Sequence, residues 1–172
     1  MAADEDEHVR DVYAQFGFAL YYTQVLEYSL VNALIYTDLI PSITKKVRTR
    51  EEREQEFDSF TQRHFETTLG TMIRRLSIAT PVPLDLEDLL RRALSKRNWL
   101  AHRYFRDRSS EFMFKNGRDK MLAELKEARA LFEEADNRLS EVIESMREKY
   151  GPTDEMLEQV SREILATYRD DG

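Results

Sequence analysis

The residues of this chain best suited to chemistry lie together between Arg97 and Tyr104, in the order Arg-Asn-Trp-Leu-Ala-His-Arg-Tyr. A guanidinium can hold a phosphate through two parallel hydrogen bonds, and an imidazole can accept or donate a proton near neutral pH. The amide of Asn98 can orient either group. These groups suit metal-independent cleavage of RNA by its 2′-hydroxyl, with Arg97 on the phosphate and His102 as the acid or base.

The pattern of apolar residues around this segment predicts a helix that turns Arg97 toward the interior. At about 100° of rotation per residue, several apolar residues fall within about 60° of Arg97. They are Leu90, Leu94, Ala101 and Tyr104. A buried guanidinium needs a partner or an anion, because an uncompensated charge in the core costs several kcal/mol. Asn98 and His102 are four residues apart and share the neighbouring face, where they could line a groove.

Glu27 is the expected partner of Arg97. It projects from the apolar stripe of the first predicted helix, so one helix carries a carboxylate inward where another carries a guanidinium. We expect the two to pair, with the carboxylate orienting the guanidinium. A purely structural ion pair is the alternative interpretation.

A single histidine in the motif predicts a homodimer, because one imidazole does not readily serve as acid and base together. No acidic residues with metal-ligand spacing flank the motif, so neither a metal nor another cofactor is expected. His64 shares a stripe with Phe57 and Phe60 and is expected to be a core histidine. His8 is expected to lie exposed in the charged amino terminus.

Basic residues concentrate on the motif helix, although the chain as a whole has a formal net charge of −7. We interpret them as a track for an RNA backbone or as an interface for an acidic antitoxin. The residues assigned to RNA binding are Arg91, Lys96, Arg103 and Arg106. A solvated helix face is the alternative.

Length and composition predict one soluble helical domain. The chain has 172 residues, 41% hydrophobic and 34% charged, with only five Gly and four Pro for tight turns. The absence of cysteine excludes disulfides and thiolate metal sites and fits a reducing cytoplasm. No apolar run approaches the roughly 20 residues that cross a bilayer, so no membrane association is expected.

The fold is expected to be all-α: an up-and-down helical bundle of four long helices plus a shorter C-terminal helix, in a single domain over residues 1–172. Pro41 should stop the first helix, a break near Gly70 is possible in the second, and Asp85 should cap the third. The four helices should cover residues 9–39, 51–78, 85 to about 115, and 119–150. Thr153 should cap the last helix, whose apolar residues are Met156, Leu157, Val160, Ile164 and Leu165.

Arg97-Asn98 followed by His102 resembles the signature of HEPN domains, an arginine, four to six residues and a histidine, with a polar residue after the arginine. HEPN domains are helical bundles, so the resemblance covers most of the chain as architecture and this short segment as motif. Such proteins are typically dimers whose paired motifs form a ribonuclease site between subunits, and many are toxins or defence effectors. The resemblance implies these roles for Arg97, Asn98 and His102.

Tyr104 extends the resemblance to a narrower group. Arg-x4-His-x-Tyr is similar to the motif of HEPN toxins paired with a nucleotidyltransferase antitoxin that adenylylates the tyrosine. An ordinary core aromatic is the alternative for Tyr104. For the whole chain, the leading hypothesis is an endoribonuclease. The competing hypotheses are a non-catalytic HEPN-like helical module that binds a protein or nucleotide, and a helical bundle whose motif is a coincidence.

Overall fold

The regular structure of the chain is entirely helical within the part that the computed structural model describes, residues 2–44 and 49–150. The prediction of an all-α protein is therefore confirmed for these ranges. None of the described helices has the length and apolarity needed to span a bilayer.

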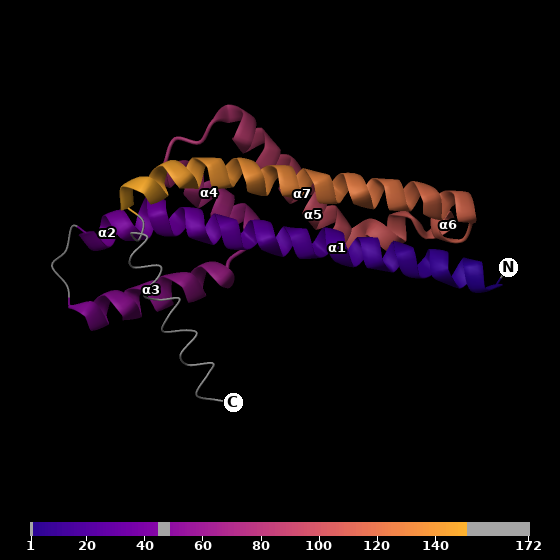
Figure 1. The fold of residues 1–172 in the computed structure, drawn as a ribbon, viewed down its shortest axis with the longest axis horizontal. Coiled ribbons are helices and arrows are strands. Elements are labelled where there is room, and N and C mark those ends of the chain that lie inside the picture. The colour runs from indigo at the N-terminus through magenta and orange to yellow at the C-terminus, as the bar shows by residue number, and fades with distance from the viewer. Residues whose placement is uncertain (1, 45–48, 151–172) are drawn as a thin grey trace.

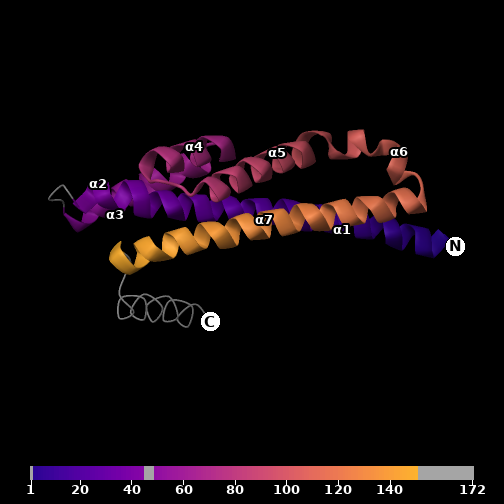
Figure 2. The same cartoon turned by 90° about the horizontal axis from the view of Figure 1, so that it is seen from above.

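Three long helices lie side by side and position the motif (Figures 1 and 2): α1 (Ala2–Leu34), α5 (Leu84–Asp107) and α7 (Lys115–Tyr150). α1 and α7 run parallel, because His8 lies beside Asp119 near the start of both helices and Ser29 donates a hydrogen bond to Asp136 farther along both. α5 runs antiparallel to α7, because Tyr104 bonds to the start of α7 whereas Asp85 pairs with Arg138 near its end. Fully buried side chains of the three helices meet in the core, among them Leu26, Leu30, Ala93, Leu125, Phe132 and Leu139.

The segment 51–78, expected as one helix or as a helix broken near Gly70, is two helices, α3 (Arg50–Phe65) and α4 (Leu69–Ala79). The break is at residues 66–68 rather than at Gly70, because the hydroxyl of Thr68 accepts a hydrogen bond from the backbone of Thr71 and starts a new helix. Thr49 starts α3 in the same way, within a reciprocal capping box with Glu52. This extra reversal is why α1 and α7 run parallel. One unbroken second helix would have made them antiparallel, so the simple up-and-down order of four helices differs from the structure.

Pro41 does not stop the first helix. α1 passes into a π-helical turn, η1 (Ile35–Leu39), and then into α2 (Ile40–Thr44), which contains Pro41. Proline lacks a backbone N–H and is tolerated in the first turn of a helix, where that donor has no helical partner. The wider turn of η1 shifts the hydrogen-bond register immediately before the proline, with the N–H of Ile40 donating to the carbonyl of Ile35.

The motif helix is shorter at its C-terminal end than expected. α5 ends at Asp107, α6 (Ser109–Phe112) makes a short corner, and α7 begins at Lys115 instead of residue 119. Pro83 is the N-cap of α5, and Asp85 lies in its first turn rather than capping it. The helix expected after Thr153 lies outside the described residues.

Candidate functional site

Arg97 lies at the edge of the buried face of α5, not in its middle. The buried residues of the helix are Leu86, Leu89, Leu90, Ala93, Leu100 and Tyr104. Their arc is centred about 30° from Arg97, because successive residues rotate by about 100°. The side chain of Arg97 is 33% exposed, and Ala101, expected on the same buried stripe, is exposed. Arg97 therefore lies at the boundary between the core and the surface.

Glu27 and Arg97 meet as expected, within one chain. A terminal nitrogen of the guanidinium lies 3.4 Å from Oε1 of Glu27, and the other donates to Oδ1 of Asn98 at 3.3 Å. Both contacts are long, and the carboxylate does not grip the guanidinium through two parallel bonds. The pair thus links α1 to the motif and orients Arg97 beside Asn98.

Asn98 and His102 are exposed and line an open hollow of about 720 Å³ on α5. The other lining residues are Arg92, Ser95, Lys96, Trp99, Arg103 and Leu131, the last from α7. Three of these side chains are cationic, and no Asp or Glu is among the lining residues. In a chain of net charge −7, this hollow is a local site that favours an anion. Arg97 is not among its lining residues.

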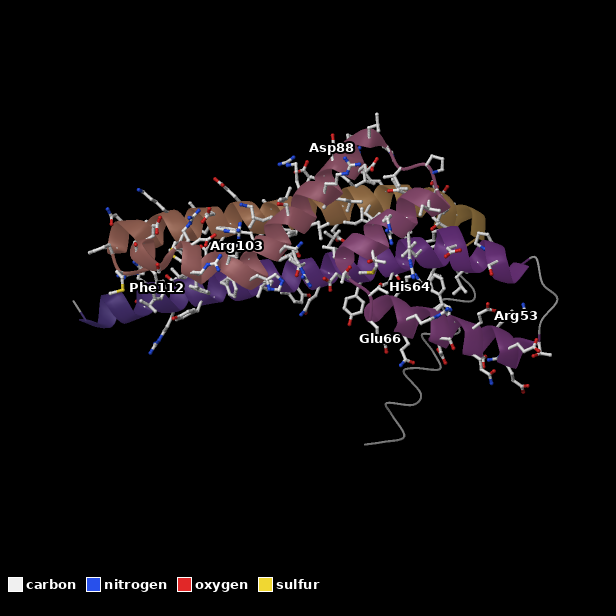
Figure 3. All side chains as sticks on the ribbon, turned by 180° about the vertical axis from the view of Figure 1, so that it is seen from behind. Arg53, His64, Glu66, Asp88, Arg103 and Phe112 are labelled. Carbon is white, nitrogen blue, oxygen red and sulfur yellow. The ribbon has the colours of Figure 1, made fainter. Side chains whose placement is uncertain are left out.

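The structure brings two of the four predicted RNA-binding residues to the hollow, Lys96 and Arg103, the second labelled in Figure 3. Arg91 and Arg106 lie outside it. Arg91 forms an ion pair with Glu87, and Nε of Arg106 lies 3.4 Å from Oδ1 of Asp107. Arg103 in the hollow also lies near Asp107, with Nε 3.8 Å from Oδ2, so Arg91 and Arg106 differ from it in their position on the helix and not in being paired.

Arg92 is the lining residue that the sequence prediction missed. It belongs to the series Arg92, Lys96, Trp99 and Arg103, whose spacings of four, three and four residues place all of them on one helix face. That spacing is the signal that separates Arg92 from Arg91 and Arg106.

Trp99 lines the hollow and is held by neighbours in α5 and at its C-terminal end. Its ring packs edge-on against Tyr104 with centroids 4.9 Å apart, and its indole N–H donates to Oδ2 of Asp107 at 3.0 Å. This hydrogen bond lowers the pKa of the Asp107 carboxyl below its ordinary value. Lys96 and Arg108 lie over the Trp99 ring at 4.8 and 5.2 Å, within range of cation–π attraction. Trp99 is therefore partly packed in the monomer.

Tyr104 is a core residue. Its side chain is 1% exposed, its hydroxyl donates to the carbonyl of Met121 at 3.2 Å, and burial raises its pKa above the ordinary value. The hydroxyl is thus neutral and shielded. Its supporting role in this structure is to back Trp99, and adenylyl transfer to it would require the hydroxyl to leave the core.

The two other histidines lie outside the hollow. His64 is buried, and its Nε2 lies 3.0 Å from Arg75 while Nδ1 lies 2.7 Å from the carbonyl of Phe60. Arginine only donates, so Nε2 accepts and Nδ1 carries the proton, as expected for a core histidine. His8 differs from the expectation of an exposed side chain, because it packs against α7 with Nε2 3.0 Å from Oδ1 of Asp119.

Among the described residues, no group of three or more His, Cys, Asp or Glu side chains is placed to hold a metal ion. The resemblance to HEPN domains rests on Arg97, Asn98 and His102 and on the helix that carries them. The chain matches no protein-family model, no curated protein and no solved structure.

Proposed function

We propose that this chain is a metal-independent endoribonuclease of HEPN type. The observation that carries the proposal is the hollow on α5, where an imidazole and an amide lie among three cations with no lining carboxylate. Phosphodiester cleavage needs a proton carrier beside a site that attracts phosphate, and the hollow supplies both. Lys96, Arg103 and Arg92 hold the RNA backbone in this proposal, and Arg91 and Arg106, which lie outside the hollow, do not contact it.

In the proposed reaction, a histidine takes the proton of the ribose 2′-hydroxyl as its oxygen attacks phosphorus. The bond to the 5′-oxygen breaks, that oxygen receives a proton, and the products are a 2′,3′-cyclic phosphate and a 5′-hydroxyl. Arg97 opposes the charge that develops on the phosphate, and Asn98 orients Arg97 or the phosphate. His102 of one copy performs one proton transfer and His102 of a second copy the other.

The proposed biological role is that of a toxin or defence effector, with the helices forming one HEPN-like domain over residues 1–172. The protein partner in this proposal is an antitoxin of the nucleotidyltransferase type. The burial of Tyr104 argues for inhibition by docking rather than by adenylylation of that residue.

The proposal is tested by incubating the purified full-length protein with total RNA in excess EDTA. Cleavage by the wild type, and its loss in His102→Ala and Arg97→Ala with helical circular dichroism retained, is the expected result. Arg106→Ala, an exposed cation of the same helix outside the hollow, serves as the matched control and should cut normally. A wild type that leaves several RNAs intact would contradict the proposal.

One observation favours the second candidate, a non-catalytic HEPN-like module that binds a nucleotide or a protein. Arg97 is held by Glu27 and Asn98 and does not line the hollow. For such a module, RNA or nucleotide binding should depend on Arg92 and Arg103 but not on His102. A binding series over Arg92→Ala, Arg103→Ala and His102→Ala, run beside the cleavage assay, separates the two functions.

A further inference from the structure

Trp99 is the only tryptophan of the chain and lines the hollow, yet the proposed chemistry gives it no role. Its partly exposed ring is fixed by its neighbours. The indole N–H is bonded to Asp107, and the ring of Tyr104 stands nearly perpendicular to it, at 88°. Arg108 lies over the ring and is itself held by both carboxylate oxygens of Glu124, at 2.9 and 2.8 Å. Trp99 is therefore a rigid aromatic surface in the wall of the hollow.

Lys96 is the group that lies over this ring from the side of the hollow. It lines the hollow itself, and its Nζ is 4.8 Å from the centroid of the Trp99 ring. A cation–π contact at a partly exposed site is weak, and the ammonium stands on a flexible four-carbon stem. The ammonium can therefore move from the ring to a phosphate bound in the hollow, which opens the ring face to a planar group.

We propose that the ring of Trp99 is the surface on which one base of single-stranded RNA stacks. Every nucleobase has a π face that can stack on an aromatic side chain, and the cations around Trp99 attract the phosphates attached to that base. The volume of the hollow, about 720 Å³, lies within the range of about 300–1,000 Å³ that is typical of pockets for small organic ligands.

The strandedness of the substrate follows from the stacking. A base in a duplex is paired and lies between its neighbours, so neither of its faces is free for an aromatic side chain. Only an unpaired base can lie flat on the Trp99 ring. This inference deepens the proposed function and rests on it for the identity of the polymer as RNA.

The position of Trp99 on α5 connects the stacked base to the proposed chemistry. Trp99 and His102 are three residues apart, so their Cβ atoms lie about 5–6 Å from each other. Arg92 precedes Trp99 by two helical turns and Arg103 follows it by one, on the same face of the helix. A base on the Trp99 ring therefore brings its own ribose and phosphate beside the imidazole, with a cation on either side.

The same geometry predicts little preference among the four bases. The N–H of the indole is already used by Asp107, so Trp99 offers a base the face of its ring and no hydrogen-bond donor. Stacking on a ring face is tolerant of sequence.

Tryptophan fluorescence tests the stacking directly, because the emission of the one tryptophan reports on the hollow. The full-length wild type is titrated with a single-stranded 2′-O-methyl RNA oligonucleotide, whose blocked hydroxyls prevent cleavage. The stacked base should quench the emission. An abasic oligonucleotide of the same length and charge tests the phosphates alone, and the annealed duplex tests paired bases. Both should quench the emission far less.

Fluorescence anisotropy of the labelled single strand compares Trp99→Leu with Trp99→Phe. Both variants lose the bond to Asp107, but only phenylalanine keeps an aromatic face. Trp99→Leu should weaken binding about 5- to 150-fold, and Trp99→Phe should recover most of the affinity. Tyr21→Leu, at an aromatic residue of α1 that is 57% exposed and outside the hollow, is the matched control and should bind normally. Circular dichroism verifies that each variant keeps its helices.

Equal quenching by the abasic and the base-carrying strands, or an unchanged affinity in Trp99→Leu, would overturn the inference. Cleavage of unmodified RNA is measured separately. Base-dependent quenching in a protein that cuts no RNA would refute the proposed ribonuclease and support the stacking surface. Cleavage without base-dependent quenching would refute the stacking surface alone, so the two failures are distinguishable.

Discussion

The guanidinium of Arg97 contacts one carboxylate and one amide, both at long hydrogen-bond distances. A substitution of Glu27 therefore tests whether this carboxylate positions Arg97 or stabilises the fold. Glu27→Gln keeps the shape and an acceptor oxygen but removes the charge. Because both partners are partly exposed, unfolding in urea should show a loss below about 1 kcal/mol. RNA cleavage should fall by less than about tenfold, whereas Arg97→Ala should cost about 100-fold or more. A stability loss above about 2 kcal/mol in Glu27→Gln would instead indicate a structural ion pair.

The hydroxyl of Tyr104 links the motif helix to α7, so its removal tests how much this contact contributes to stability. Tyr104→Phe removes the bond to the carbonyl of Met121, and the free energy of unfolding should fall by about 1 kcal/mol near neutral pH. The carbonyl of Met121 keeps its place in the helix α7, so the loss of stability should be smaller than that for a buried carbonyl with no hydrogen bond. Urea unfolding measures the change, and an unaltered stability would contradict the hydrogen bond.

The raised pKa of Tyr104 predicts that the stability of the folded protein falls at alkaline pH. Burial raises the pKa of Tyr104 in the folded protein, while in the unfolded chain the phenol ionises at its ordinary pKa near 10. Its contribution is therefore complete below about pH 10 and is lost as the pH rises toward the folded-state pKa. Stability of the wild type should decline above that point, and the decline should be shallower in Tyr104→Phe. Equal slopes in the two proteins would contradict the assignment.

At the scale of the helices, two glycines should respond in opposite directions to the same substitution. A Cβ at Gly117, in the first turn of α7, would collide with the carbonyl oxygen of Glu111, so Gly117→Ala must open the corner between α6 and α7. We expect a loss of about 1–3 kcal/mol or more. Gly17→Ala in α1 meets open space and should gain about 0.5–1 kcal/mol. Thermal unfolding at low protein concentration compares them, and losses in both would contradict the described corner.

The long helices α1, α5 and α7 were predictable because each has an extended apolar stripe, and their approximate positions follow from it. A division near Gly70 was anticipated, but its position between α3 and α4 was not, because the residues before Thr68 have no breaker and the hydroxyl cap of Thr68 decides the boundary. The π-helical turn before Pro41 was also hidden, since a proline predicts a stop unless the preceding turn changes register. Helix caps and the hydrogen-bond register therefore decide where these helices begin and end, which the spacing of apolar residues does not show.

The motif and the contact between Glu27 and Arg97 were predictable from residue types and helical phase. The exposure of the Arg97 side chain was not predictable, because the angle of a residue around its helix does not show where the neighbouring helices leave that helix uncovered. Arg92 lines the hollow whereas Arg91 and Arg106 do not, and the helical spacing of Arg92 with Lys96 and Arg103 is the signal that the prediction missed.

At the scale of the whole molecule, the proposed function makes the distribution of charge decisive for RNA binding. A net charge of −7 repels a polyanion, so binding must depend on the few cations gathered at the hollow. Each contact between a cation and a phosphate releases counterions, and for single-stranded RNA it contributes about 0.7 to the slope of log affinity against log salt concentration. The slope therefore counts the cations that touch the backbone.

Arg92→Ala and Arg91→Ala make a matched pair for that count, since they are neighbours of equal charge on one helix. Only Arg92 lines the hollow, while Arg91 is paired with Glu87. Fluorescence anisotropy with a labelled single-stranded RNA, in the uncleaving His102→Ala background, should show the slope falling by about 0.7 in Arg92→Ala and unchanged in Arg91→Ala. Both variants have the same net charge, so a general effect of charge would move the two equally. Equal slopes in the two variants would mean that RNA does not lie in the hollow, and this result would contradict the proposed site.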